Sequence, residues 1–174
     1  IDLAICAGAP QNLYAAVMDP ASGNALRMLK TTDGGATWND LISNVPNYQA
    51  GAGWYHTSLA VSPTNPSLVY AGGLGFIVSS NGGASWSNID SGADGRGPHV
   101  DHHGIGFDAS GRLLDGNDGG IYRLDNSNPG SIHWTSLNGN LNTIQFTGIA
   151  VDPSNPNVAF GGSQDNGTER FDGD

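Results

Sequence analysis

Four segments of the chain carry the side chains that could perform chemistry. The first ends in aromatic residues and a histidine, the second is a run of histidines around an aspartate, and two glycine-flanked turns carry acids and amides. These residues are Trp54, Tyr55, His56, His99, Asp101, His102, His103, Asn117, Asp118, Gln164 and Asp165. Imidazoles and carboxylates can hold a cation or move protons, and aromatic faces beside planar polar groups suit sugar rings.

These residue types could form a metal site or the active site of a glycoside hydrolase. A divalent metal could use His99, Asp101 and His103, whereas His102 and His103 cannot both face one ion because neighbours on a strand point to opposite sides. Glycoside hydrolysis needs two carboxylates on either side of a sugar, for which Asp101, Asp118 and Asp165 are the candidates. Aspartate followed by glycine is also an ordinary turn former, so hydrogen bonding between loops is the plain alternative for all of these groups.

The same segments could also bind a ligand without turnover. The candidate ligand-binding residues are Trp54, Tyr55, His56, His102, Asn117, Asp118, Gln164 and Asp165. The alternative for Trp54 and Tyr55 is packing inside the fold. No cofactor is expected to be required, and a divalent cation is the one such group that these residues could bind.

Composition and charge exclude several classes of function. The formal net charge is −10, with no basic stripe to neutralise phosphates, so a nucleic-acid partner is not expected. The sequence contains no run of 18 apolar residues, so a membrane-spanning helix is not expected. The single cysteine, Cys6, lies in an apolar run and cannot form an internal disulfide.

The elements that must position these residues are short strands. Glycine accounts for 27 of 174 residues, and the chain has one lysine, Lys30, and one glutamate, Glu169. Exposed faces of long helices are usually rich in lysine and glutamate, whereas glycine, asparagine, aspartate and proline between short apolar runs are turn chemistry. The composition therefore predicts an all-β fold.

An internal repeat sets the architecture. Trp38, Trp86 and Trp134 are 48 residues apart, and each closes a similar phrase, of which the third is longer and degenerate. A second phrase, 60–73, returns at 150–162, with a middle copy at 106–114 and a partial one at 10–17. Four short strands in roughly 50 residues make one propeller blade. We therefore predict a β-propeller of four-stranded blades, with about three and a half blades present: 1–50, 51–97, 98–143 and an incomplete 144–174, together one partial domain over 1–174.

The phrase that ends at Trp38 has the form Ser/Thr-x-Asp-x-Gly-x-Thr-Trp and resembles the Asp-box (BNR) repeat of sialidases, sortilin-type receptors and xyloglucanase-like glycoside hydrolases. The first copy, 31–38, matches at every defined position, and the second has Asn81 for aspartate and Ser85 for threonine. The segments 99–103, 116–122 and 162–168 also resemble bacterial secreted BNR-repeat proteins of the glycosyl-hydrolase-like group. The resemblance implies a structural role for Asp33, Trp38, Asn81, Trp86 and Trp134.

The geometry of a propeller would bring the chemical residues to one face. Aligning the repeats places His56, His102 and Phe146 in register where the innermost strands begin, and the turns after the second strands carry Asp118 and Asp165. Both sets should lie on one rim of the central channel. We therefore expect a polar cluster at that rim.

The leading functional hypothesis is a secreted or cell-envelope recognition module that binds a glycan or another extracellular polymer. One alternative is part of a xyloglucanase-like glycoside hydrolase. Such enzymes draw an aspartate pair from two propellers, and neither position maps onto this chain. Another is a structural protein-interaction propeller, as in sortilin-like receptors. Sialidase chemistry is not expected, because it needs an arginine cluster and a tyrosine nucleophile. An open arc of blades also predicts a further partner, either the rest of a longer propeller or a second copy of the chain.

Overall fold

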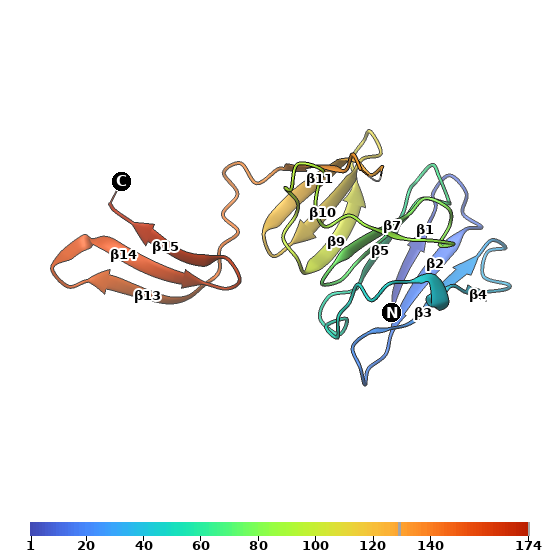
Figure 1. Cartoon of the computed structure of the whole chain (residues 1–174), viewed down its shortest axis with the longest axis horizontal. Coiled ribbons are helices and arrows are strands. Elements are labelled where there is room, and N and C mark those ends of the chain that lie inside the picture. Colours follow the sequence, from blue (N-terminus) through green and yellow to red (C-terminus); the bar gives the residue numbers. More distant parts are fainter. Residues whose placement is uncertain (129, 174) are drawn as a thin grey trace. The chain divides into compact units, whose positions relative to one another are not determined.

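A computed structural model describes residues 1–128 and 130–173, and Pro129, within the degenerate third phrase, lies outside them. The chain forms two compact units, Ile1–Gly139 and Asn140–Asp174, each described by itself below. Figure 1 shows the strands of both units, coloured along the sequence. Within the described residues all regular structure is strand, apart from the short 3-10 helix η1 (Ile42–Asn44).

The first unit contains three antiparallel four-stranded sheets, which we call blades 1, 2 and 3. Blade 1 is β1 (Asp2–Ile5), β2 (Leu13–Met18), β3 (Ala25–Thr31) and β4 (Asn39–Asp40). Blade 2 is β5 (Ser58–Val61), β6 (Val69–Gly72), β7 (Phe76–Ser79) and β8 (Ser87–Asn88). Blade 3 is β9 (His102–Phe107), β10 (Leu113–Asn117), β11 (Gly120–Asn126) and β12 (His133–Ser136). Each sheet keeps its strands in chain order, because every connection is a short turn between neighbours.

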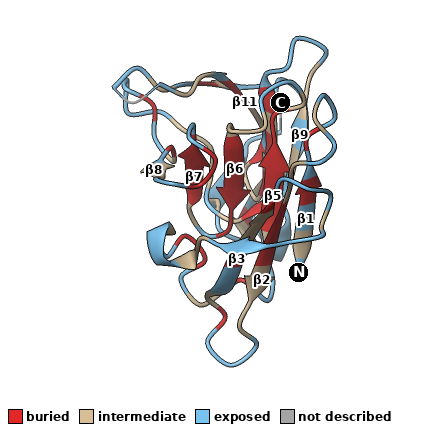
Figure 2. Ribbon diagram, turned by 90° about the vertical axis from the view of Figure 1, so that its right-hand side faces the viewer, coloured by how far each residue is buried: buried red, intermediate tan, exposed pale blue. Residues whose placement is uncertain are grey.

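The first three strands of blade 2 are buried on both faces, as Figure 2 shows by the red of β5, β6 and β7. Leu59, Val61 and Ile77 pack toward blade 1 in one apolar cluster. Tyr70 and Phe76 belong to a second cluster with Trp134 of blade 3. Alternate residues of each strand therefore supply two different inter-blade cores, as side chains that alternate across a strand require.

The second unit holds a three-stranded antiparallel sheet, β13 (Phe146–Asp152), β14 (Asn155–Ser163) and β15 (Gly167–Phe171), which we call blade 4. Its register repeats that of the other blades: Ile149 pairs with Gly161 as Leu59 pairs with Ala71. The prediction of an all-β fold with four-stranded blades, the last one incomplete, is confirmed.

The turns between the third and fourth strands share one hydrogen-bond pattern in blades 1 and 2. In blade 1 the Thr37 amide and hydroxyl donate to Asp33 at 2.9 and 2.6 Å, and the Gly35 amide donates to Thr31 Oγ1 at 3.0 Å. In blade 2 Asn81 accepts from the Ser85 amide at 2.9 Å and donates to the Ser85 hydroxyl at 2.8 Å. Asparagine thus replaces aspartate without changing the turn, because one side-chain oxygen accepts the same amide.

The three repeat tryptophans differ in burial. Trp134 is 5 % exposed and donates from Nε1 to the Ile89 carbonyl at 2.7 Å, and Trp86 packs against the core between blades 1 and 2. Trp38 is 40 % exposed, and its indole N–H donates to Gly35 within its own turn at 3.1 Å. Trp38 therefore closes its own turn, whereas Trp86 and Trp134 pack between blades.

Within the described part of the chain, no helix is long and apolar enough to cross a membrane.

Candidate functional site

A loop rich in small residues displays two aromatic side chains beside the start of β5. The Gly53 amide donates to the Gly23 carbonyl at 2.9 Å, and Gln49 Nε2 donates to Thr57 Oγ1 at 2.8 Å, so the loop is fixed at both ends. A Cβ on Gly53 would lie 2.7 Å from the Gln49 side chain, which explains glycine there. The loop carries Trp54 and Tyr55 to the surface, where they are 72 % and 61 % exposed. Packing inside the fold, the alternative for these two residues, is not what the structure shows.

The residue after this aromatic pair is buried and paired with an aspartate. His56 is 2 % exposed, and its Nε2 lies 2.7 Å from Asp101 Oδ1. Asp101 has a left-handed φ of 66°, which turns its side chain toward His56 just before β9 begins. Non-glycine residues rarely adopt this conformation, so surrounding contacts must hold it in place.

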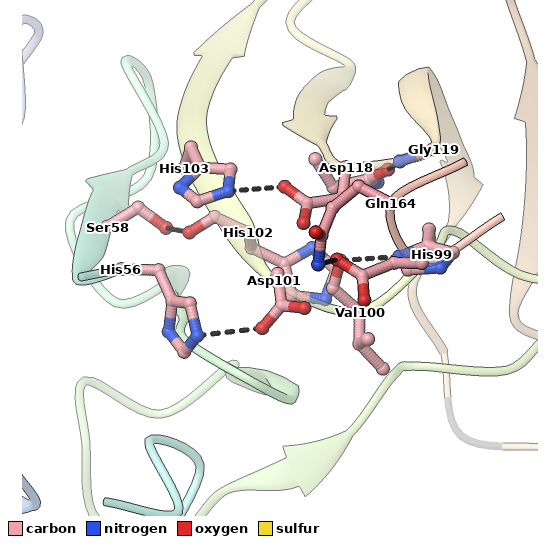
Figure 3. A network of polar contacts seen from close by, with 12 residues as sticks. His56, Ser58, His99, Val100, Asp101, His102, His103, Asp118, Gly119 and Gln164 are labelled. Carbon is pink, nitrogen blue, oxygen red and sulfur yellow. Dashed lines mark hydrogen bonds and ion pairs between the residues drawn. The ribbon is translucent and has the colours of Figure 1, made fainter. Parts of the chain in front are cut away.

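A second histidine–aspartate pair lies beside the first. His103 Nε2 is 2.6 Å from Asp118 Oδ1, which joins β9 to the turn between β10 and β11. The rings of His56 and His103 meet edge to face, with centroids 5.9 Å apart. Figure 3 shows both pairs with the imidazoles on one side and the carboxylates on the other. Because an oxygen of Asp101 and one of Asp118 lie within 4.8 Å of each other, the two acids face one small volume.

The aromatic loop contacts the second histidine–aspartate pair through Tyr55, whose ring meets His103. The Tyr55 ring lies edge to face with His103 at 5.0 Å and is 5.6 Å from the Trp54 ring. Exposed aromatic faces and carboxylate acceptors are therefore side by side. We call the set Trp54, Tyr55, His56, Asp101, His103 and Asp118 the rim site.

Two residues expected to bind ligand lie beneath the rim site. His102 is 1 % exposed, stacks on Phe76 at 4.6 Å and lies 2.9 Å from Asp115 through Nδ1. Asn117 is 9 % exposed and donates to Asp115 at 2.7 Å. Neither offers a surface to a ligand, because side chains alternate along β9 and β10 and theirs point into the core.

Asp115 was not among the residues singled out from the sequence. It is fully buried. The sequence feature that could have identified it is a carboxylate directly after Leu113 and Leu114, at the second-strand position where blade 2 has Ala71. Burying a carboxylate without a full set of hydrogen-bond partners costs free energy of folding, which makes Asp115 a candidate for a role in the site.

The other predicted residues are His99, Gln164 and Asp165. His99 Nδ1 is 3.0 Å from the Val100 carbonyl, which engages one of the nitrogens available to a metal. Gln164 and Asp165 belong to the second unit, where the Gln164 amide bonds to Gln145 and Asp165 has a left-handed φ of 58°. A metal at His99, Asp101 and His103 stays a prediction.

Comparison with known proteins identifies the fold. No family model and no curated protein sequence matches the chain. Among solved structures, the chain is similar to a GH74 enzyme of Niastella koreensis, with a TM-score of 0.57, 20 % identity and coverage of 97 % of this chain and 27 % of that one. It is similar to the GH74 xyloglucanase of Xanthomonas campestris, with a TM-score of 0.57, 19 % identity and coverage of 94 % of this chain and 26 % of the other.

A third similar structure is an ancestral GH74 enzyme, with a TM-score of 0.50, 14 % identity and coverage of 99 % of this chain and 25 % of that one. The chain spans about a quarter of the length of these structures. At such identities the likeness concerns fold alone. Together with the repeated antiparallel blades, it identifies the chain as a partial β-propeller.

Proposed function

We propose that this chain is a glycan-recognition module that binds an extracellular polymer at the rim site. The observation that carries the proposal is the exposed Trp54–Tyr55 pair in contact with His103 and next to the Asp101 and Asp118 carboxylates. A sugar ring has an apolar face of C–H groups and an edge of hydroxyls. Aromatic rings cover the first, and carboxylates accept hydrogen bonds from the second. A polymer ligand of this class would place the protein outside the cell or in the cell envelope.

The repeated turns support a proposal about family. We infer that the chain belongs to the Asp-box (BNR) propellers, because the 31–38 and 79–86 turns share a hydrogen-bond pattern centred on Asp33 and Asn81. The role of these turns is structural, since Asp33 bonds only within its own turn among the contacts of the described residues. Family membership of this kind does not distinguish an enzyme from a binding module.

A polysaccharide pull-down followed by calorimetry tests the recognition function. Xyloglucan and a panel of other neutral and acidic polysaccharides are offered to the wild type and to the Trp54→Ala and Asp118→Asn variants. Loss of one stacking face or one charged acceptor should weaken binding by about tenfold or more. Trp38→Ala is the matched control, because it removes another exposed indole from a turn that lacks the acidic pair. Absence of binding to every polysaccharide by a folded wild type would refute the proposal.

A second function is favoured by the acidic pair itself. Retaining glycosidases hold two carboxyl groups about 5–5.5 Å apart, and one carboxylate oxygen of Asp101 lies within 4.8 Å of one of Asp118. If the chain contributes to a hydrolase, Asp118→Asn should abolish release of reducing ends from xyloglucan while the polymer still binds. Binding by the wild type without turnover would leave recognition as the function.

A further inference from the structure

Blade 3 carries a buried charge at a position that is small and apolar in the other blades. Asp115 pairs across the sheet with Ile105. The matching pairs are Leu3 with Ala15, Leu59 with Ala71 and Ile149 with Gly161. Only in blade 3 does this second-strand position hold a carboxylate, and its side chain there is fully buried. The fold does not need the charge, since three blades form without it.

The buried carboxylate is incompletely satisfied. Asp115 Oδ2 accepts from Asn117 Nδ2 at 2.7 Å and lies 2.9 Å from His102 Nδ1. Oδ1 has no hydrogen-bond partner among the described residues. A buried histidine–aspartate pair with an unsatisfied oxygen is a poor source of stability, and replacing such a pair by well-packed apolar groups is often neutral or favourable.

The contacts of Asp115 lead to both sides of the rim site. On one side is His102, whose chain neighbours are Asp101 and His103. On the other is Asn117, whose Oδ1 accepts the Gly119 amide at 2.9 Å and so fixes the turn that carries Asp118. The Gly119 carbonyl is held separately by Asn138 Nδ2 at 2.8 Å. A single buried side chain thus links β9 and β10, and Asp101 and Asp118 lie immediately next to the ends of these strands.

We propose that Asp115 is a positioning residue: through His102 and Asn117 it holds Asp101, His103 and Asp118 in the arrangement that recognises the ligand. The inference rests on the proposed glycan-binding function. It assigns the buried charge to the geometry of the rim site rather than to the stability of the blade.

Blade 4 supplies the replacement that tests this role. Phe146 lies three residues before Ile149, as His102 lies three residues before Ile105, and a Cβ on Gly161 would lie 2.3 Å from the Phe146 ring. In blade 4 an aromatic ring therefore covers the position that Asp115 occupies in blade 3. The variant His102→Phe/Asp115→Gly copies that pair without adding polar groups to the core.

The matched control is His133→Phe/Asp125→Gly, which makes the same two changes at another histidine–aspartate contact of blade 3, away from the rim site. Asn117→Ala is a second variant, which keeps the His102–Asp115 pair and cuts only its link to Gly119. Each protein is measured by thermal unfolding, by calorimetry with the polysaccharide that the wild type binds, and by amide hydrogen exchange at Gly119.

For the blade 4 copy we expect an unchanged or higher Tm, affinity reduced about tenfold or more, and about tenfold faster exchange at Gly119, since one buried hydrogen-bond link is lost. Asn117→Ala should show the same reduced affinity and the same faster exchange at Gly119, and the control variant should show neither. Unchanged exchange and affinity in both variants would overturn the proposal, as would a fall in Tm with unchanged exchange at Gly119 in Asn117→Ala. If the wild type binds no polysaccharide but Gly119 exchange still rises in both variants, the positioning role stands and the glycan-binding function fails.

Discussion

At the scale of single residues, the rim site depends on two histidine–aspartate pairs with different exposure. His56 is buried, whereas the His103 side chain is 34 % exposed and forms the contact between the aromatic loop and Asp118. The buried pair therefore fixes the geometry, and the exposed pair offers its groups to a ligand. This division follows from burial, since a buried polar group must keep its partner and an exposed one can exchange it for a hydroxyl or water.

The buried pair gives a stability prediction. His56 Nδ1 already has no hydrogen-bond partner among the described residues, so Asp101→Ala would leave the whole imidazole unpaired. We expect a loss of about 1–3 kcal/mol in the free energy of unfolding. Asp101→Asn, whose amide oxygen can still accept from Nε2, should lose less. Urea denaturation of the two variants measures the difference, and equal losses would contradict the pairing.

The exposed pair predicts a change in binding without a change in stability. His103→Phe keeps the ring contact with Tyr55 but cannot donate to Asp118. Affinity for the bound polysaccharide should fall about tenfold or more, because Asp118 loses its orienting partner. The midpoint of urea denaturation should move little, since both side chains are partly exposed. Calorimetry and denaturation on the same preparation check both statements, and a large loss of stability would assign His103 to the fold.

At the scale of the element, blades 1 and 2 are each closed by the turn before their fourth strand. In blade 1, hydrogen bonds from the Thr37 hydroxyl and amide and from Thr31 lower the pKa of Asp33 from 3.8 to about 2. In blade 2 the neutral Asn81 makes the corresponding turn. The same turn is therefore held by an ionisable side chain in blade 1 and by a non-ionisable one in blade 2.

This comparison predicts a pH dependence. Because the pKa of Asp33 is lower in the folded chain than in the unfolded one, its contribution to stability is present above pH 3.8 and is lost as the pH falls toward 2. Asp33→Asn should flatten the acid-induced loss of stability in this range, relative to the wild type. Asn81→Asp should steepen it. Thermal unfolding between pH 2 and 5 measures both, and parallel curves for all three proteins would show that the turn charge does not matter.

At the scale of the whole molecule, the first blade leaves an apolar face uncovered. Leu3 and Ile5 of β1 are 63 % and 54 % exposed, whereas Leu59 and Val61, their counterparts in β5, are 7 % and 4 % exposed against blade 1. Equivalent positions of the first strand thus form an inter-blade core in blade 2 and an exposed apolar surface in blade 1. An exposed apolar face of this kind favours another blade as its partner.

We expect a second copy of the chain to cover this face when the protein is studied alone. Sedimentation velocity should show association that increases with concentration, and Leu3→Lys/Ile5→Lys should abolish it, because lysines block apolar sheet contacts. Leu26→Lys, which changes an exposed leucine of β3, serves as the control. A compact monomer at all concentrations of the wild type would contradict the expectation.

Much of the architecture followed from local sequence. The 48-residue spacing of the tryptophans and the returning phrase at 60–73 and 150–162 predicted the blades, and the observed sheets confirm the fold. These signals are local because a blade is an antiparallel run of neighbouring strands, so turn chemistry and alternation define it before any long-range contact forms.

The site followed only in part. Alternation along a strand predicted that His102 and His103 point to opposite sides, and the structure places His103 at the rim and His102 in the core. The segment 99–103 does not show which of the two sides faces the core, because in a propeller both faces of an inner strand lie next to neighbouring blades or loops. Asp115 was missed for a related reason: a carboxylate in an apolar strand has meaning only once the neighbouring blade is seen to bury it.

The sequence by itself determined the turn types and the strand order of this protein, since each depends on residues within a few positions of one another. It also determined the period, because the repeated phrases can be counted along the chain. Only the tertiary structure decided which histidine meets which aspartate. His56 meets Asp101 across 45 positions of the chain, and His103 meets Asp118 across 15. Those pairs form because the packing of blades 2 and 3 brings a loop, a strand start and a turn to one rim, and no local rule specifies that packing.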